Sequence, residues 1–396
     1  MLKKLFAKKK VACPYCYVAF EPNRFAFRCT GQHQPGRPQC PQVPDPELRK
    51  HFQDDSPHYP VIADEDGEPV LAKNEAVCPA CQCVSSRRIC SNCHSFMPRD
   101  LDADSPLFGL VGERQSGKTV LLTVLHKQLI NNIPRRFGCS VTNHNPESGL
   151  ARELQRFETT MTGGSRQLPG QTSANVKNRA PAVYEWTRRD GASRRHGTIF
   201  SFYDNAGENL HSQQSMMNQR YLNVANGVII LLDPFSFPAN RQLAAEKGVT
   251  VNPQETPEGV VNAITQTIRD AHNIDRRKLI NLPVAVVIAK IDAFMHQIPE
   301  NNPLKSPESM TPYFDQGESQ SIHDHLASMV AQWRGDNLLM TLQQNYSNFR
   351  LFGVSALGAE PDYRKARLQS QGLQPHRVTD PLLWLMAEKR IIPQEK

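Results

Sequence analysis

The sequence contains no apolar run that approaches the ~20 residues needed to cross a membrane as a helix. It also lacks the apolar core and cleavage site of a secretory signal peptide, because the opening segment Met1–Lys10 is basic and too short. No internal repeat occurs outside the cysteine groups, and Cys139 is the only one of the ten cysteines that lies beyond Cys93. These absences argue against a transmembrane, secreted or repeat protein, and we expect a cytoplasmic location.

The excess of positive charge is concentrated at one end of the chain. The formal net charge is +7, and five of the positive charges belong to Lys3, Lys4, Lys8, Lys9 and Lys10, with no acid among the first ten residues. The remainder is nearly balanced, and a solvated basic end is more common than a functional one. Nucleic acid is therefore only weakly indicated as a partner.

A phosphate-loop motif follows the first hundred residues. It reads Gly112-Glu113-Arg114-Gln115-Ser116-Gly117-Lys118-Thr119. Residues 107–111 before it are typical of a buried strand, and apolar residues after it recur at helical spacing as far as Pro134. A strand that leads through such a loop into a helix aims backbone N–H groups and the helix dipole at one point. We expect nucleotide phosphates there, with Lys118 on the β and γ phosphates and the Thr119 hydroxyl on Mg²⁺.

A second phosphate-side motif follows the strand-like residues 198–203. It places Asp204 at the end of a buried strand, where phosphate-loop enzymes hold a carboxylate near Mg²⁺. Gly207 follows three residues later and lets the backbone approach a γ-phosphate, because no Cβ stands in the way. We expect Asp204 and Gly207 to line the phosphate site.

The order of the remaining patterns predicts an α/β fold. Residues 181–187 and 198–203 flank an Asp190-Gly191 turn and are typical of an antiparallel hairpin. Buried strands at 227–232, 284–289 and 351–354 alternate with helical segments, which favours a mainly parallel sheet with helices on both faces. Residues 293–350 form an insertion that we interpret as a pair of helices packed on the domain rather than as a partner-binding lobe.

These motifs, in this order, resemble those of the Ras-like and translation-factor-like (TRAFAC) GTPases. The resemblance implies a Ras-like fold in which Asp292 of Lys290-Ile-Asp292 reads the guanine edge. It further implies that Lys290 lies over the base ring and that Ser355 and Ala356 pack against the base. The expected cofactors are GTP or GDP with Mg²⁺.

The sequence departs from the family pattern at two positions. Ala289 stands where an Asn or Thr usually braces the base loop against the phosphate loop, so guanine is less firmly indicated than phosphate binding. Glu208 replaces the usual water-orienting Gln, and Arg114 inside the phosphate loop is a candidate to offset its charge.

In the first switch we expect Thr172 to ligate Mg²⁺ with Thr119 and Asp204, and we prefer it to Thr159, Thr160 and Thr162.

The first hundred residues carry cysteine patterns typical of structural zinc. Cys78 and Cys81 form one knuckle and Cys90 and Cys93 another, and we expect these four thiols to bind one Zn²⁺. We expect a second zinc on Cys13, Cys16, Cys29 and Cys40, with His33 as an alternative ligand to either of the last two. Cys83 and Cys139 are then left as free thiols. Disulfides would need an oxidising compartment, which the cytoplasmic location opposes.

The patterns together predict a zinc-ribbon-like module over residues 1–100 and a GTPase domain over 101–396. Zinc knuckles ahead of a phosphate loop, with the Asp204–Glu208 motif and a late apolar segment at 381–385, resemble the pattern of bacterial GTPase-domain proteins of the double-GTPase type. The resemblance implies a partner protein such as a second GTPase or an effector. We expect a GTP-binding molecular switch with slow hydrolysis, in which Lys118 and Arg114 act on the reacting phosphate and Glu208 positions the attacking water. The alternative is an ATP-using enzyme with a nucleic-acid-binding zinc ribbon, and a carboxylate at Asp292 argues against it.

Overall fold

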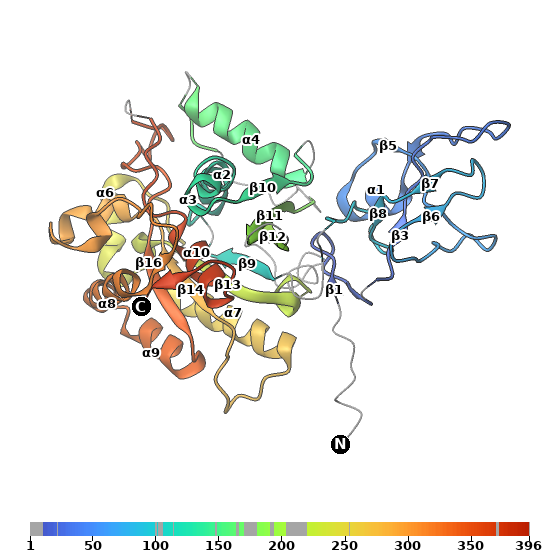
Figure 1. Cartoon of the computed structure of the whole chain (residues 1–396). Helices are drawn as coiled ribbons and strands as arrows, with labels where there is room; N and C mark the ends of the chain where they lie inside the picture. The colour runs from blue at the N-terminus through green and yellow to red at the C-terminus, as the bar shows by residue number, and fades with distance from the viewer. Residues whose placement is uncertain are drawn as a thin grey trace.

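The computed structural model describes residues 11–21, 23–99, 101, 106–113, 115–146, 149–163, 166–169, 180–190, 194–202, 220–252, 254–369 and 372–395. Figure 1 shows a large α/β part beside a smaller module built from the N-terminal hundred residues. In the described residues, the α/β part contains a four-stranded parallel sheet, a three-stranded antiparallel sheet and a two-stranded pair, whereas the smaller module contains short two-stranded pairs.

The central sheet is parallel and four-stranded, in the order β16-β14-β13-β9. Its strands are β9 (Leu107–Gly112), β13 (Ala225–Leu232), β14 (Val284–Ile288) and β16 (Phe349–Gly353). Every residue of β14 is buried, as expected for a parallel strand that is covered on both faces. The mainly parallel α/β sheet expected from the sequence is therefore confirmed.

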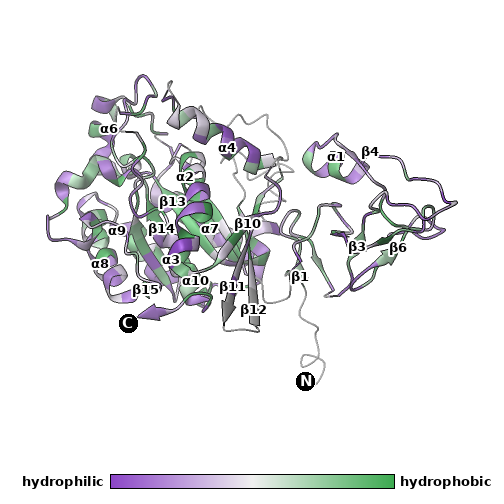
Figure 2. Cartoon of the chain, turned by 45° about the horizontal axis from the view of Figure 1, so that its top comes forward, coloured by the Kyte–Doolittle hydropathy of each residue, from purple (hydrophilic) through white to green (hydrophobic). Residues whose placement is uncertain are grey.

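Helices cover both faces of this sheet because alternate strand residues point to opposite sides. Ala285 and Val287 of β14 belong to one apolar core, which includes α2 (Lys118–Asn131), α4 (Gly149–Thr162) and α10 (Asp380–Glu388). The short helix α3 (Ile133–Phe137) also contributes to that core. Figure 2 shows hydrophobic residues, in green, along the strands of the central sheet.

The opposite face carries α7 (Pro257–His272), α8 (Gln316–Gln332) and α9 (Asp336–Asn345). Ile322 of α8 and Leu342 of α9 share a core with Val286 of β14, so the insertion packs on the domain as a pair of helices. The smaller elements on this part of the chain are α6 (Arg241–Lys247), the 3₁₀ turns 234–236, 238–240, 291–297 and 303–305, and the pair β15 (Phe314–Asp315) and β17 (Gln394–Glu395).

A separate antiparallel sheet contains β10 (Ser140–Asn143), β11 (Ala182–Asp190) and β12 (Arg194–Phe202). The expected hairpin is confirmed, with Ala182 opposite Phe202 and Asp190 opposite Arg194. The third strand of this sheet, β10, pairs with β11 and was not predicted from the sequence.

The seam between β12 and β9 is occupied by a tyrosine side chain. The Tyr221 hydroxyl lies 2.8 Å from the Phe108 carbonyl oxygen of β9 and 3.1 Å from the Ser201 carbonyl oxygen of β12. It also accepts the Leu110 N–H of β9 at 3.0 Å. Phe108 and Phe200 stack beside it with ring centroids 5.6 Å apart. One hydroxyl therefore bridges the two sheets where no strand ladder joins them in the described part of the chain.

The N-terminal module is built from short strands and one helix, and cysteines form much of its core. The elements are β1 (Val11–Ala12), β2 (Ala19–Phe20), β3 (Ala26–Phe27), β4 (Val43–Pro44), α1 (Pro46–Phe52), β5 (Pro57–His58), β6 (Ala76–Val77), β7 (Val84–Ser85) and β8 (Arg88–Ile89). Asp45 caps α1 and forms a buried ion pair with Arg28 at 2.8 Å, which ties the helix to the end of β3.

None of the helices in the described ranges combines the length and the apolar character needed to cross a bilayer.

Candidate nucleotide and zinc sites

The phosphate-loop motif lies where the sequence predicts it, between the end of β9 and the start of α2. A side chain at Gly112 would clash with the neighbouring strand, because a Cβ there would lie 2.2 Å from the Leu231 carbonyl oxygen. Gly117 is required by conformation, because its φ of 91° lies in the left-handed region. No described side chain caps the start of α2, so its first backbone N–H groups are directed at the loop.

The polar side chains of the loop fold back onto its own backbone. The Lys118 ammonium donates to the Gly112 carbonyl oxygen at 3.1 Å and to the Glu113 carbonyl oxygen. The Ser116 hydroxyl also donates to the Glu113 carbonyl oxygen, at 2.9 Å. Thr119 follows at the second position of α2. This arrangement places one positive charge at the helix N-terminus, which suits a polyphosphate.

Five of the expected phosphate-side residues lie outside the described residues. They are Arg114, Thr172, Asp204, Gly207 and Glu208. Their roles remain predictions from the sequence.

The base-side residues lie at the carboxyl ends of β14 and β16, next to the phosphate loop. Lys290, with a left-handed φ of 49°, donates to the Gln115 carbonyl oxygen at 3.1 Å. Burial raises the pKa of Asp292, and a hydrogen bond from the Ser355 side chain partly offsets that effect. Ser355 also accepts the Gly358 N–H at 2.7 Å, and Ala356 packs against the core. The structure thus brings the Lys-x-Asp and Ser-Ala elements together beside the loop.

Three residues that the sequence analysis did not single out for their side chains connect these two parts of the site. The buried Glu113 carboxylate accepts the Asp233 N–H at 2.9 Å and the Ser236 hydroxyl at 2.8 Å. Asp233 in turn binds the Lys290 ammonium at 2.5 Å. The signal was weak because Glu113 occupies a variable position of the loop motif, and Asp233 and Ser236 lie in no motif.

Two further polar groups that the sequence analysis missed lie near the base-side residues. The Tyr363 hydroxyl and one Glu360 carboxylate oxygen are buried and have no hydrogen-bond partner among the described residues. The Tyr363 ring packs edge-on against Phe235, with centroids 5.8 Å apart. Burial, reinforced by the Asp292 carboxylate, raises the pKa of Tyr363. These groups are available to a polar ligand in this region.

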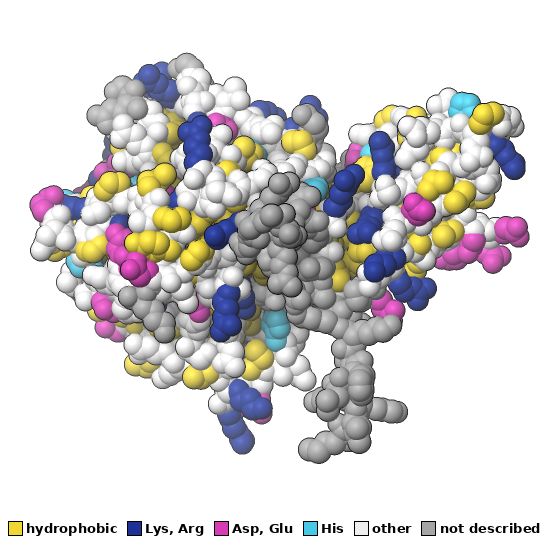
Figure 3. Space-filling view, viewed as in Figure 1, with side chains coloured by type: hydrophobic (Ala, Val, Ile, Leu, Met, Phe, Trp, Pro, Cys, Tyr) yellow, Lys and Arg dark blue, Asp and Glu magenta, His cyan; other side chains and the backbone are white. Residues whose placement is uncertain are grey.

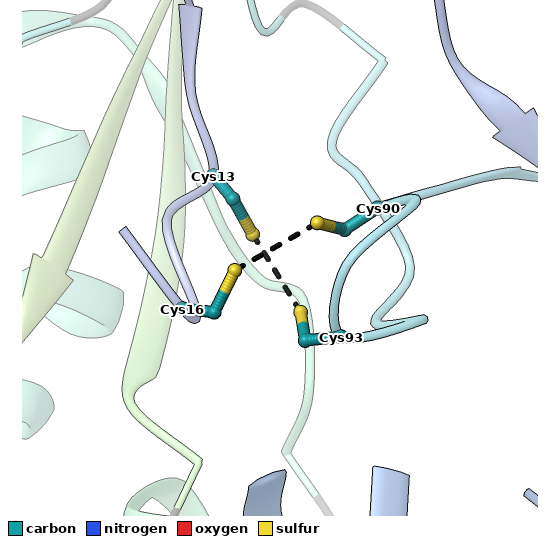
Figure 4. Close-up of side chains that lie close together, drawn as sticks. All are labelled: Cys13, Cys16, Cys90 and Cys93. Atoms are coloured by element: carbon teal, nitrogen blue, oxygen red, sulfur yellow. Dashed lines mark hydrogen bonds between the residues drawn. The ribbon is translucent and has the colours of Figure 1, made fainter. Parts of the chain in front are cut away.

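The first cysteine cluster consists of Cys13, Cys16, Cys90 and Cys93, which are all buried. Figure 4 shows that their four sulfur atoms point toward one another. The Sγ atoms of Cys13 and Cys93 are 3.8 Å apart, as are those of Cys16 and Cys90. A tetrahedral Zn²⁺ with ~2.3 Å zinc–sulfur bonds requires sulfur atoms about 3.8 Å apart. Burial raises the pKa of Cys13 and Cys93, and a bound cation would offset the cost of ionising these two thiols. The donor set therefore fits a structural zinc.

The second cysteine cluster contains five thiols rather than four. Cys29, Cys78, Cys81 and Cys83 lie together, with the Cys29 sulfur 3.4 Å from those of Cys81 and Cys83. Cys40 lies beside them, with its sulfur 3.7 Å from that of Cys78. Cys83, expected to be free, therefore belongs to a metal-type cluster, and that expectation was wrong. His33 is exposed and lies in neither cluster.

The expected division of the knuckles between the two zincs was also wrong. Cys78 and Cys81 do not share a cluster with Cys90 and Cys93; each pair instead joins cysteines from the beginning of the chain. The antiparallel pairing of β3 with β8 is the cause, because it sets Ala26 opposite Ile89. The chain between Cys83 and Cys90 is extended through β7 and β8, which at ~3.3 Å per residue separates the two knuckles by on the order of 20 Å.

All three Cys-x-x-Cys knuckles share one backbone geometry. The first cysteine N–H donates to the carbonyl of the residue five positions later, at 3.0 Å to Val18, 2.9 Å to Cys83 and 3.0 Å to Ser95. The residue after each second cysteine has a left-handed φ: 60° at Tyr17, 58° at Gln82 and 57° at His94. This turn holds two sulfurs on one side, as a tetrahedral metal requires.

The first knuckle contacts the antiparallel sheet directly. The Ser201 hydroxyl of β12 donates to the Pro14 carbonyl oxygen at 2.6 Å and lies 3.0 Å from the Tyr17 hydroxyl. The Tyr17 ring packs on Tyr221, with centroids 4.8 Å apart. Cys13, Cys16 and Tyr17 share an apolar core with Leu107 of β9 and Ile199 of β12. We call the contacts of Pro14, Tyr17, Ser201 and Tyr221 the knuckle junction.

Comparison with known proteins identifies one family. Residues 107–339 match the family described as Double-GTPase 2, which covers more than half of the chain. No curated protein matches the chain.

Three solved structures to which the chain is similar share little sequence with it. A signal recognition particle receptor SRb-GTP/SRX complex from Chaetomium thermophilum is 12% identical with a TM-score of 0.28, covering 66% of this chain and 96% of that chain. Sup35 complexed with GDP is 12% identical with a TM-score of 0.23, covering 68% and 40%. A bacterial selenocysteine-specific elongation factor EF-Sec is 13% identical with a TM-score of 0.26, covering 64% and 26%.

Proposed function

Because the chain belongs to the Double-GTPase 2 family, a family of GTP-binding domains, we propose that it is a GTP-dependent switch whose zinc module transmits the nucleotide state to a protein partner. The observation that carries this proposal is the knuckle junction. It connects a zinc knuckle to β12, the strand that runs into the segment of Asp204, and through Tyr221 to β9, the strand that runs into the phosphate loop.

The nucleotide would be held by two groups of residues. Lys118 and the backbone N–H groups at the start of α2 would bind the phosphates, while Asp292, Lys290 and Ser355 would bind guanine. Thr119, together with Thr172 and Asp204, would hold Mg²⁺, which neutralises phosphate charge when bound. The two zinc sites would stabilise the module and take no part in chemistry, because four sulfur ligands leave no position for water.

We expect intrinsic hydrolysis to be slow and to depend on a partner. Glu208 stands where a water-orienting amide is usual, and its charge opposes a γ-phosphate. Arg114 in the loop, or a cation from a partner, would offset that charge, as an arginine finger does. We propose a second GTPase or an effector as the partner, and the membership in a double-GTPase family supports an interaction with another protein.

Hydrogen exchange tests this proposal in the full-length zinc-loaded protein. We expect the amides of residues 11–20 to exchange at different rates with GDP and with a non-hydrolysable GTP analogue, because the knuckle junction couples these residues to any movement of β12. Tyr17→Phe removes the hydroxyl that reaches Ser201 and should reduce this difference several-fold. Tyr59→Phe makes the same change in the same module away from the junction and should leave the difference unchanged. Equal exchange in the two nucleotide states of the unmodified protein would contradict the proposal.

A further inference from the structure

Glu113 connects the phosphate loop to the chain that follows β13. Its side chain is 2% exposed and accepts the Asp233 N–H at 2.9 Å. The Ser236 hydroxyl lies 3.0 Å and 2.8 Å from its two carboxylate oxygens. Both donors belong to the turn 233–236, so these contacts hold that turn against the loop.

The same turn also holds the base loop. Asp233 is 4% exposed, accepts the Phe235 N–H at 3.0 Å and binds the Lys290 ammonium at 2.5 Å. Lys290 completes the connection by donating to the Gln115 carbonyl oxygen at 3.1 Å, two residues after Glu113. The contacts form a closed ring from the phosphate loop through the turn to the base loop and back.

The sequence lacks the usual side-chain brace of the base loop at Ala289, and the ring of contacts can take its place. The methyl group of Ala289 cannot form a side-chain hydrogen bond, so the residue before Lys290 cannot brace the base loop against the phosphate loop. The left-handed φ of 49° at Lys290 adds a conformation that a non-glycine residue adopts only when its surroundings hold it.

We propose that Glu113, Asp233 and Ser236 are positioning residues that replace the missing brace at Ala289 and hold Lys290 and Asp292 in register with the phosphate loop. The proposal rests on the nucleotide site described above and assigns the three residues no contact with nucleotide. Their removal should weaken nucleotide binding and reduce the preference for guanine, because both halves of the ligand must be bound in one geometry.

The charges in the ring support this role. Burial, with the nearby Asp233 and Glu255 carboxylates, raises the pKa of Glu113 to about 8. The Lys290 ammonium neutralises Asp233, and the Lys118 ammonium donates a hydrogen bond to the Glu113 carbonyl oxygen. A mostly protonated Glu113 therefore keeps its hydrogen bonds without placing a second negative charge beside a triphosphate.

Nucleotide binding and release measured with fluorescent GDP test the proposal. Ser236→Ala removes the hydroxyl and leaves the Glu113 carboxyl group, and we expect about tenfold faster GDP release, as the loss of one buried hydrogen bond implies. Glu113→Ala should act in the same direction with a larger effect and should narrow the gap between GDP and ADP affinities. Glu113→Gln keeps the shape and an acceptor oxygen and should restore most of the binding. Glu300→Ala changes an exposed residue of the insertion and should leave GDP release and base preference unchanged.

The outcomes separate this proposal from the proposed function. If the unmodified protein and Lys118→Ala bind GDP equally, or neither binds, the nucleotide site itself is wrong. If the unmodified protein binds GDP but Ser236→Ala and Glu113→Ala match Glu300→Ala in release rate and base preference, the ring has no positioning role. A fall in thermal stability of Ser236→Ala with unchanged release and base preference would make the ring structural only and would also overturn the proposal.

Discussion

At the scale of single residues, the site depends on side chains whose importance only three-dimensional contacts reveal. The loop glycines and Lys118 could be predicted because their roles follow from local backbone geometry and charge. Glu113 could not, because it occupies a position that the loop pattern leaves open, and its partners lie 120 and 123 residues away.

The raised pKa of Glu113 gives a pH dependence of stability. Its pKa rises from 4.5 to about 8 on folding, so between these values the folded state holds a proton that the unfolded state has lost. The stabilisation that this bound proton gives to the folded state is complete below pH ~4.5 and is lost as the pH rises toward about 8. We expect Glu113→Gln to flatten the decline in the free energy of unfolding over that window, measured by urea denaturation without nucleotide. An unchanged slope would show that Glu113 titrates normally.

At the scale of elements, the alternation of strands and helices could be predicted, and the long-range pairings could not. The hairpin of β11 and β12 follows from a local turn signal and is confirmed. The division of the cysteines depends on β3 pairing with β8, some 60 residues later, and neither two-residue strand carries a periodic pattern. The five residues expected around the γ-phosphate and Mg²⁺ lie outside the described residues, so the catalytic part of the site still rests on the sequence.

The five-thiol cluster gives a prediction about zinc content. Cys83 lies at the knuckle position that Val18 and Ser95 occupy in the other two knuckles, whereas the Cys40 sulfur lies 3.7 Å from that of Cys78, near the tetrahedral spacing. Either thiol can therefore complete the site. We expect Cys40→Ser and Cys83→Ser each to retain two zinc ions per chain by elemental analysis, and the double variant to retain one.

Cys139→Ser is the matched control, because this thiol lies in neither cluster. Loss of one zinc in a single variant would instead identify that cysteine as an obligatory ligand.

At the scale of the whole molecule, the zinc module and the GTPase part share a core. Cys13 and Cys16 are buried with Leu107, Val183 and Ile199 of the two sheets. Removal of zinc should therefore lower the stability of the GTPase part as well as that of the module. We expect a strong chelator to lower the melting temperature and to speed GDP release, with zinc restoring both. Chelation that unfolds the module but leaves GDP release unchanged would show that the shared core carries no coupling.

The side-chain bridge between the sheets has a mechanical consequence. Sliding two paired strands past each other requires a whole ladder of main-chain hydrogen bonds to break together. At the seam of β9 and β12, the hydrogen bonds in the described part of the chain are those of one tyrosine hydroxyl, with packed rings beside it and no ladder. Shear within the α/β part is therefore easiest along this line, and it would shift the hairpin with its attached knuckle relative to the phosphate loop while every other strand pair stays intact.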